Sequence, residues 1–201
     1  MKKSLLILSC LLSGCSFLGQ EEPLPLYTLK NETFEQTDLL SVPLAVDTPL
    51  TELSLNTPRI ALTPSPYQRD YIADGQWPDK LPRVFQEVLL ESLNQRWGGA
   101  YVNRVSAGLQ VKYVLQSEIQ DFSVYYLDKG CPEIRQKIIF KLVNLRDRQV
   151  IAARTFTQIT PAPFVTMKGI VEAFNRGLQC LLEEAMVWME DVFLKERTLN
   201  T

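Results

Sequence analysis

The sequence predicts an α+β domain built as a two-layer sandwich, with a mixed but mostly antiparallel sheet and two main helices on one of its faces. Three consecutive segments in the second half of the chain alternate polar and apolar residues, and two longer segments repeat apolar residues at helical spacing. The resulting order is strand, strand, helix, three strands, helix. With 201 residues, of which 46% are hydrophobic, the chain is long enough for one domain with its own core.

The first half of the predicted domain supplies two short strands and a helix. Residues 41–47 and 58–63 are short apolar runs bounded by prolines, which favours strands. Residues 81–97 place apolar side chains at helical spacing with charged side chains between them. Gly98 and Gly99 follow as a stop signal, so an amphipathic helix is expected here.

The second half supplies three strands and a long helix. Residues 109–120 alternate with the two-residue period of a strand that has one face in water. Residues 134–145 and 150–159 follow with a turn between them, so the three strands should form an antiparallel meander. Residues 167–194 carry one apolar stripe at helical spacing and should lie on the sheet.

The composition excludes several classes of function. The chain has no histidine, which removes Ser-His-Asp and Cys-His catalysis and all histidine-ligated metals. Lys and Arg number 21 against 23 Asp and Glu, and the basic residues are scattered, so nucleic acid is not an expected partner. No GxSxG, HExxH, GxxxxGK[ST], GxGxxG or CxxC pattern occurs. We therefore expect no catalytic residue, no metal ligand and no dissociable cofactor.

The first 15 residues have the layout of a secretory signal. Two lysines precede an apolar stretch, residues 5–12, and small residues follow it. The stretch is too short to span a bilayer, which takes about 20 apolar residues. The segment Leu12-Ser13-Gly14-Cys15 resembles the lipobox of bacterial lipoproteins, in which the cysteine thiol receives a diacylglycerol and the bond before it is cut. The alternative is an ordinary signal peptide with an incidental cysteine.

The lipobox resemblance implies a division of the chain. Residues 1–14 would be the signal peptide, residues 15–26 a lipidated tether and residues 27–197 the folded domain. The covalent lipid on Cys15 would hold the protein on a membrane without a transmembrane segment. In lipoproteins of this kind an aspartate after the lipidated cysteine favours the inner membrane. Ser16 stands at that position, which implies the outer membrane with the domain facing the periplasm.

Two cysteines would remain besides the lipidated one. The periplasm is oxidising, so a disulfide between Cys131 and Cys180 is one hypothesis. Two free thiols are the alternative. Cys131 is expected in the loop that opens a strand, whereas Cys180 lies over halfway along the long helix and away from its apolar stripe.

An aromatic segment precedes the first predicted helix. Tyr67, Tyr71 and Trp77 lie in it, and an exposed loop with such side chains would offer a contact surface to a partner. The alternative is that Trp77 packs over the start of the helix at residues 81–97.

Several short motifs occur in an order that resembles the ABC-type transport auxiliary lipoprotein family, and the resemblance covers nearly the whole chain. The motifs are the lipobox, Tyr27-Thr28-Leu29, Leu44-Ala45-Val46, Arg59-Ile60-Ala61-Leu62, the stretch that holds Tyr71 and Trp77, Ile151-Ala152-Ala153-Arg154-Thr155-Phe156, and the last helix with Trp188. Cys131, Cys180 and Pro78 depart from the family's pattern.

The family resemblance implies a non-enzymatic lipoprotein on the outer membrane. Its partners would be an MCE-domain periplasmic protein of a paraquat-inducible type of lipid transport system and, through it, an ABC permease and ATPase. A homo-oligomer that matches an MCE ring is also conceivable. The competing hypothesis is an outer-membrane lipoprotein that activates a cell-wall synthase or supports envelope assembly, because fold alone does not separate the two. A lipid-modifying enzyme is a weaker third hypothesis, since the sequence identifies neither a nucleophile nor a base.

Overall fold

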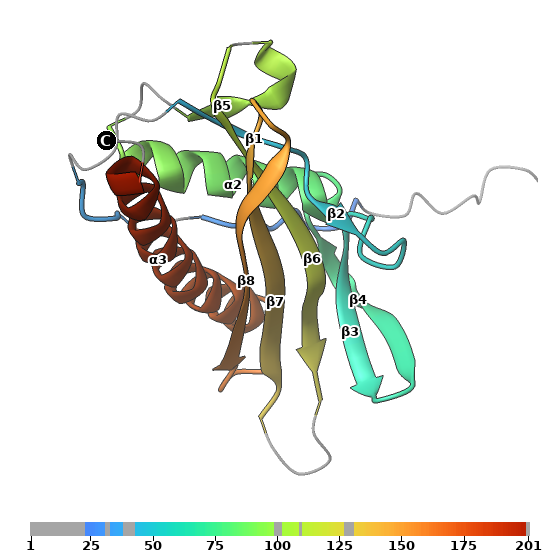
Figure 1. The fold of residues 1–201 in the computed structure, drawn as a ribbon. Helices are drawn as coiled ribbons and strands as arrows, with labels where there is room; N and C mark the ends of the chain where they lie inside the picture. Colours follow the sequence, from blue (N-terminus) through green and yellow to red (C-terminus); the bar gives the residue numbers. More distant parts are fainter. Residues whose placement is uncertain are drawn as a thin grey trace, which may run out of the picture.

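A computed structural model describes residues 23–30, 33–37, 43–98, 102–108, 110–126 and 131–199, and the predicted lipidation site Cys15 lies outside them. The strands are β1 (Leu44–Val46), β2 (Leu50–Thr51), β3 (Arg59–Ser65), β4 (Gln68–Gln76), β5 (Val102–Arg104), β6 (Tyr113–Tyr125), β7 (Glu133–Asn144) and β8 (Gln149–Pro161). The helices are α2 (Leu81–Arg96), the short 3-10 turn η2 (Val105–Ala107) and α3 (Met167–Leu199). The strands form one curled sheet (Figure 1).

Most of the sheet is attached to β6. On one side β7 pairs antiparallel with β6, and β8 pairs antiparallel with β7. On the other side β1, β2 and β3 follow one another along β6, and each is parallel to it. The sheet extends further through β5, beside β1, and β4, beside β3.

The sheet is therefore mixed, and the prediction that it is mostly antiparallel is wrong. Alternation of polar and apolar residues reports which face of a strand is buried, and it is the same for either strand direction. The direction depends on the connections, and these lead β1, β2 and β3 along β6 in the direction of β6 itself.

A bulge explains why β6 is longer than its sequence pattern. Ile119 pairs with Ile138 and Asp121 pairs with Lys137, which leaves Gln120 as an extra residue in β6. Ile119 is buried before the bulge and Phe122 after it, so the buried positions change from odd to even numbers. The alternation expected for residues 109–120 stops at this point, although the strand continues to Tyr125.

The segment expected to be an exposed aromatic loop is largely a strand. β4 pairs antiparallel with β3 along Gln68–Gln76 and forms an edge of the sheet. Most of its side chains are exposed or half-buried. A strand with few buried residues lacks the strong alternation that sequence analysis detects, and β4 was missed for that reason.

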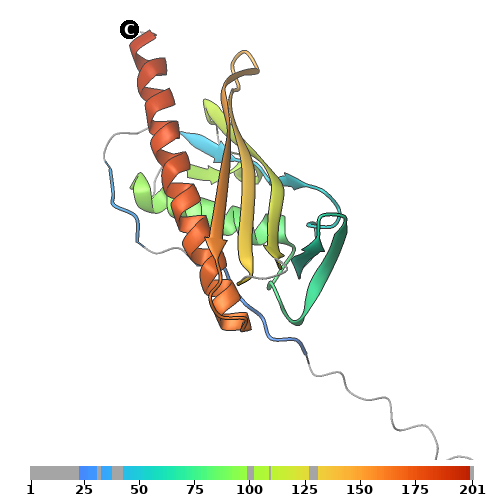
Figure 2. The same ribbon diagram turned by 90° about the horizontal axis from the view of Figure 1, so that it is seen from below.

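Both long helices pack on the same face of the sheet. Phe85 of α2 stacks on Phe140 of β7 with ring centroids 6.4 Å apart. Phe174 of α3 stacks on Phe122 of β6 at 4.9 Å. Figures 1 and 2 show α2 and α3 on one side of the strands, and the main hydrophobic core lies between them and the sheet. Neither helix, over its described residues, has the length and apolar composition needed to cross a membrane.

Helix α3 approaches the sheet closely at Gly177. A Cβ atom at this position would lie 2.5 Å from Oε1 of Gln136 and 2.5 Å from Oγ1 of Thr160. The buried amide of Gln136 donates a hydrogen bond of 3.0 Å to the carbonyl of Phe174. The lack of a side chain at Gly177 therefore lets α3 lie directly against β7 and β8.

The N-terminal segment joins the domain at Pro25. The carbonyl of Pro25 accepts a hydrogen bond from the backbone N–H of Gln76 at 3.1 Å, and the N–H of Tyr27 donates to the carbonyl of Gln76 at 2.9 Å. At the other end of this segment, the N–H of Thr37 donates to the carbonyl of Arg96 at the end of α2. The described parts of this segment, residues 23–30 and 33–37, thus contact the end of β4 and the end of α2.

Candidate functional site

The three aromatic residues proposed as a partner surface lie in different environments. Tyr67 is at the tip of the β3–β4 hairpin and its side chain is fully exposed. Tyr71 is half-buried on β4. Trp77, directly after β4, is 1% exposed. Only Tyr67 and part of Tyr71 are therefore open to a partner.

Trp77 belongs to the core. Its ring packs edge-on against Phe174 of α3 at 5.4 Å and against Phe122 of β6 at 6.3 Å. Its backbone N–H donates to the carbonyl of Pro58 at 2.7 Å. The interpretation of Trp77 as a partner contact is thus wrong, because the largest side chain of the segment fills the space between α3 and the sheet.

Tyr71 holds the connection between β2 and β3 in place. Its hydroxyl donates a hydrogen bond of 3.1 Å to the carbonyl of Ser54, in the middle of that connection. The guanidinium of Arg59 lies 3.9 Å from the centroid of its ring. The contacts of the half-buried Tyr71 therefore stabilise the loop, and they leave little of its side chain for a partner.

A second link fixes the same loop to β4. Arg69 of β4 lies 3.3 Å from the carboxylate of Glu52, which directly follows β2. The same guanidinium donates a hydrogen bond of 3.0 Å to the hydroxyl of Ser123 on β6. The β2–β3 connection is consequently bound to the neighbouring hairpin through Glu52 and through Ser54.

The outer face of β6 continues this polar network. The hydroxyl of Ser123 donates to Asp121 at 2.6 Å, and the hydroxyl of Tyr125 donates to the same carboxylate at 2.8 Å. Burial raises the pKa of Tyr125, and its hydrogen bond to Asp121 raises it further. The phenol therefore stays protonated at neutral pH and serves as a donor.

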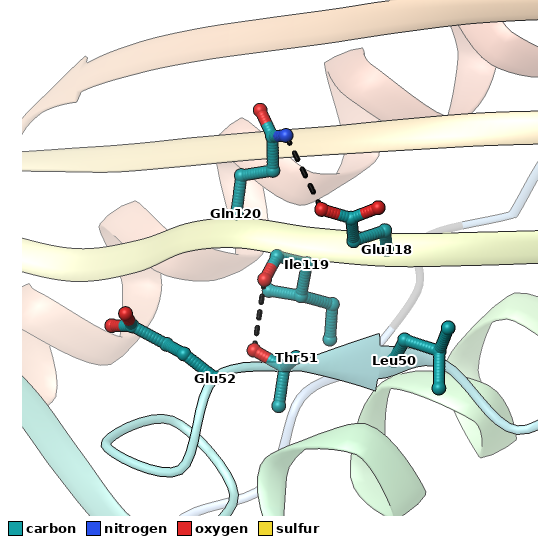
Figure 3. Close-up of a pocket in the computed structure, with 6 residues that line it drawn as sticks. All are labelled: Leu50, Thr51, Glu52, Glu118, Ile119 and Gln120. Carbon is teal, nitrogen blue, oxygen red and sulfur yellow. Dashed lines mark hydrogen bonds between the residues drawn. The ribbon is translucent and has the colours of Figure 1, made fainter.

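Two leucines, one in β2 and one in the connection that follows it, face solvent. Leu50 is 72% exposed and Leu53 is 88% exposed. Leu50 lines an open hollow of about 520 Å³ between β2 and β6, together with Thr51, Glu52, Glu118, Ile119 and Gln120. Figure 3 shows this hollow, where the Thr51 hydroxyl donates to the Ile119 carbonyl at 2.8 Å and holds β2 on β6.

We call Leu50 and Leu53 the outer apolar surface. Both side chains are highly exposed, and they flank Thr51 and Glu52, which are bound to β6 and to Arg69 of β4. An exposed apolar side chain held in a fixed position loses little entropy on binding, so such a surface is suited to docking.

A separate polar cluster lies on the helical side, around Glu190 of α3. Its carboxylate accepts hydrogen bonds from Arg96 at 2.8 and 3.1 Å, from the Trp97 indole at 2.9 Å and from the Thr37 hydroxyl at 3.1 Å. Burial alone would raise the pKa of Glu190, but the hydrogen bonds from Arg96 and Trp97 outweigh it and lower this pKa. The bond to Glu190 likewise raises the pKa of Arg96. The cluster joins α2, α3 and the N-terminal segment, so its role is structural.

Cys131 and Cys180 are two free, exposed thiols in the structure. Cys131 lies just before β7, and Cys180 lies on α3. The structure thus has two free thiols, which was the alternative to the hypothesis of a disulfide.

The distance along β7 and α3 explains why the two cysteines do not meet. Gln136 of β7 contacts Phe174 of α3. Trp188, later in α3, packs on Phe156 of β8, which pairs with Ile138, later in β7. The strand and the helix therefore run in the same direction from the first contact. Cys131 precedes Gln136 by five residues, about 16 Å of extended chain. Cys180 follows Phe174 by six residues, about 9 Å of helix. The two thiols lie on opposite sides of that contact, beyond the Cα separation of about 7 Å that a disulfide allows.

Within the described part of the chain, no three Asp, Glu, Cys or His side chains are grouped so that they could hold a metal ion. The polar groups described above are paired as networks that position loops and helices. The most exposed aliphatic side chains beside these networks are Leu50 and Leu53 of the outer apolar surface.

Comparison with known proteins gives the family. A family model described as the ABC-type transport auxiliary lipoprotein component matches residues 27–185, which is most of the chain. The chain belongs to the ABC-type transport auxiliary lipoprotein family. This confirms the resemblance seen in the order of the sequence motifs. No curated protein matches the chain.

Solved structures show that the fold of this auxiliary lipoprotein recurs. Protein XCC0632 from Xanthomonas campestris, of the family DUF330, superposes with a TM-score of 0.73 at 20% identity, covering 88% of this chain and 98% of its own. A second crystal structure, of an uncharacterized protein, superposes with a TM-score of 0.67 at 15% identity, covering 84% of this chain and 99% of its own. At these identities the likeness shows the fold alone.

Sequence analysis missed Leu50 and Leu53 as surface residues and Glu190 as the centre of a buried cluster. The two leucines lie in a short run between prolines, and nothing in that run shows whether they point inward or outward. The partners of Glu190 are 93, 94 and 153 residues away in sequence, so no local pattern reports them.

Proposed function

We propose that this protein is the outer-membrane component of an ABC/MCE-type system that moves lipid between membranes, and that it acts by docking and not by catalysis. The observation that carries this proposal is the family match over residues 27–185. Lipid that crosses an aqueous space needs a sheltered apolar path. A domain anchored by lipid would hold the end of that path against its membrane.

The anchor in this proposal is the lipid on Cys15. The lipobox resemblance supports it, and Ser16 supports sorting to the outer membrane. Replacing Cys15 by alanine should leave the precursor uncut and unlabelled by radioactive fatty acid. The matched variant Cys180→Ala should be processed and labelled normally. Fatty-acid labelling of the Cys15→Ala protein would contradict the anchor.

The docking site in this proposal is the outer apolar surface. Leu50 and Leu53 are among the most exposed large apolar side chains of the described residues, and Glu52 between them is already paired with Arg69. An apolar centre with a polar surround is the usual composition of a protein interface. The partner would be the periplasmic MCE-domain protein.

The test is recovery of the partner from the native envelope. The tagged, lipidated protein is extracted in mild detergent and captured, and the bound proteins are identified by mass spectrometry. An MCE protein with its permease and ATPase is the expected result. Recovery of a cell-wall synthase in their place would support the competing function and overturn the transport role.

The same experiment tests the docking surface. Leu53→Asp should reduce recovery of the MCE protein about tenfold or more, which corresponds to about 1.4 kcal/mol of lost binding free energy. Leu145→Asp is the matched control, because Leu145 is an exposed leucine in the β7–β8 turn, outside this surface. Equal recovery with both variants would exclude the outer apolar surface as the docking site.

A further inference from the structure

A second exposed apolar surface lies where the N-terminal segment meets the start of α3. Leu24 and Leu26 are exposed on the N-terminal segment. Phe164 and Val165 are exposed in the connection from β8 to α3, at 67% and 63%. The two pairs are remote from each other in sequence and lie at one end of the domain.

The two pieces of this surface are joined at Gly75 of β4. A Cβ atom on Gly75 would lie 2.5 Å from the ring of Tyr27 and 3.0 Å from Cε of Met167. Tyr27 directly follows Leu26, and Met167 begins α3 two residues after Val165. Figure 2 shows the N-terminal segment beside the first turn of α3.

The connection that carries Phe164 has a fixed shape. A Cβ atom on Gly169 would lie 2.7 Å from the carbonyl oxygen of Phe164 and 2.8 Å from its Cβ. The connection is thus folded tightly onto the first turn of α3, and the Thr166 hydroxyl accepts a hydrogen bond from the Gly169 N–H at 3.1 Å. The side chains of Phe164 and Val165 are therefore held outward by the backbone.

The predicted anchor leaves little chain between this surface and a bilayer. Seven residues, 16–22, separate Cys15 from Pro23. Even fully extended, that length spans only about 28 Å. The end of the domain at which residue 23 emerges must consequently stay near the membrane that holds the lipid.

We propose that Leu24, Leu26, Phe164 and Val165 form a membrane-contact surface that enters the headgroup region of the bilayer carrying the anchor. The proposal rests on lipidation of Cys15, which belongs to the proposed function. We infer a bilayer as the binding partner of this surface, because a short lipidated tether raises the local concentration of lipid beside these side chains. Apolar side chains placed at an interface add to the hold of an acyl anchor.

The proposal gives the domain a defined orientation on the membrane. β8 leads away from this end, from Pro161 back to Val150 across eleven residues, or about 36 Å. Val150 is 55% exposed at the far end of β8. It therefore provides a control valine of similar exposure that the bilayer does not reach.

The experiment uses two variants of the processed, lipidated protein, and each carries one fluorophore at one end of the domain. Cys131→Ser and Cys180→Ser remove the two free thiols, and Val165→Cys or Val150→Cys adds one labelling site. The protein is reconstituted into phosphatidylethanolamine–phosphatidylglycerol vesicles with or without a nitroxide on the lipid headgroup. We expect the label at position 165 to lose most of its emission to the nitroxide and to shift to shorter wavelength, and the label at position 150 to change little.

Two outcomes would overturn the proposal, and flotation of the vesicles separates them. If the protein floats with the vesicles and the label at position 165 is not quenched, the anchor holds and the membrane-contact surface alone is wrong. If the protein does not float, the anchor itself fails, and the proposed function fails with it. A further variant carries Phe164→Asp and has its label on Leu26→Cys. It should float normally and show less quenching than the protein with the same label and Phe164 unchanged.

Discussion

The helical side and the outer side of the sheet use polar groups in different ways. On the helical side, Glu190 is 6% exposed and accepts hydrogen bonds from three side chains on two other segments. On the outer side, Arg69 pairs with an exposed carboxylate of Glu52 at 3.3 Å. Both are ion pairs, but the side chains of the first are much less exposed to water than those of the second.

This difference separates residues that hold the fold from residues that are free to bind. Removal of one partner from a buried pair leaves an uncompensated charge in a medium of low dielectric constant, which costs several kcal/mol. Removal of one partner from an exposed pair costs about 0–1 kcal/mol, because water replaces it. Residues on the outer side can therefore be substituted with little loss of stability, so they are free to serve in binding.

The largest effect should come from the core residue of the aromatic segment. Trp77→Ala should lower the free energy of unfolding by about 3–5 kcal/mol, because it leaves a cavity between Phe174 and Phe122. Denaturant unfolding measures the change. Tyr67→Ala, ten residues earlier and fully exposed, should change it by less than about 0.5 kcal/mol. Similar losses for both variants would contradict the division of this segment into core and surface.

The buried ion pair should give the next effect. Glu190→Ala should lower the free energy of unfolding by about 3 kcal/mol, because Arg96 and the indole N–H of Trp97 lose their acceptor. Glu190→Gln should cost less, since the amide oxygen still accepts one of these bonds. Equal costs for the two variants would mean that the cluster acts through packing and not through hydrogen bonds.

The lowered pKa of Glu190 gives this cluster a pH dependence. A carboxyl group whose pKa is lower in the folded state stabilises the fold above its unfolded pKa, about 4.3 for Glu, and this stability is lost as the pH falls through the folded value. The wild type should therefore lose stability more steeply below about pH 4 than Glu190→Gln. Parallel pH profiles for the two proteins would rule out Glu190 as the source.

A smaller loss is expected where α3 touches the sheet. Gly177→Ala should lower the free energy of unfolding by about 1–2 kcal/mol, although alanine favours helix by about 1 kcal/mol, because the new Cβ meets Gln136 and Thr160. Glu172→Ala, on the same helix in an exposed pair with Lys168, should change it by less than about 0.5 kcal/mol. A more stable Gly177→Ala protein would show that α3 has room to move away from the sheet.

Local signals account for what could be predicted of the fold. The helix expected at residues 81–97 is α2, Leu81–Arg96. It could be predicted because its apolar spacing and the glycines after it are local features of the sequence. The bulge at Gln120 and the parallel direction of β1, β2 and β3 depend on contacts with other strands, so the alternation pattern did not contain them.

The candidate site divides in the same way. The aromatic segment was noticed for its composition, but its pattern does not show that Trp77 turns inward while Tyr67 stays at a hairpin tip. The exposure of Leu50 follows from the pairing of β2 with β6, and that of Leu53 from where Arg69 and Tyr71 hold its loop, and both are tertiary effects. Sequence reasoning located the segment, and the three-dimensional contacts decide which residues are available.

The smallest effect on stability should come from Arg69, and it is the sharpest test of the outer side. Arg69→Ala should change the free energy of unfolding by less than about 1 kcal/mol, because its pair with Glu52 is partly exposed. It should nevertheless reduce recovery of the partner, since the loop that presents Leu53 loses its link to β4. Arg69→Lys should restore part of the recovery, because an ammonium group can still pair with Glu52. Normal recovery with Arg69→Ala would mean that Tyr71 alone suffices to hold the loop.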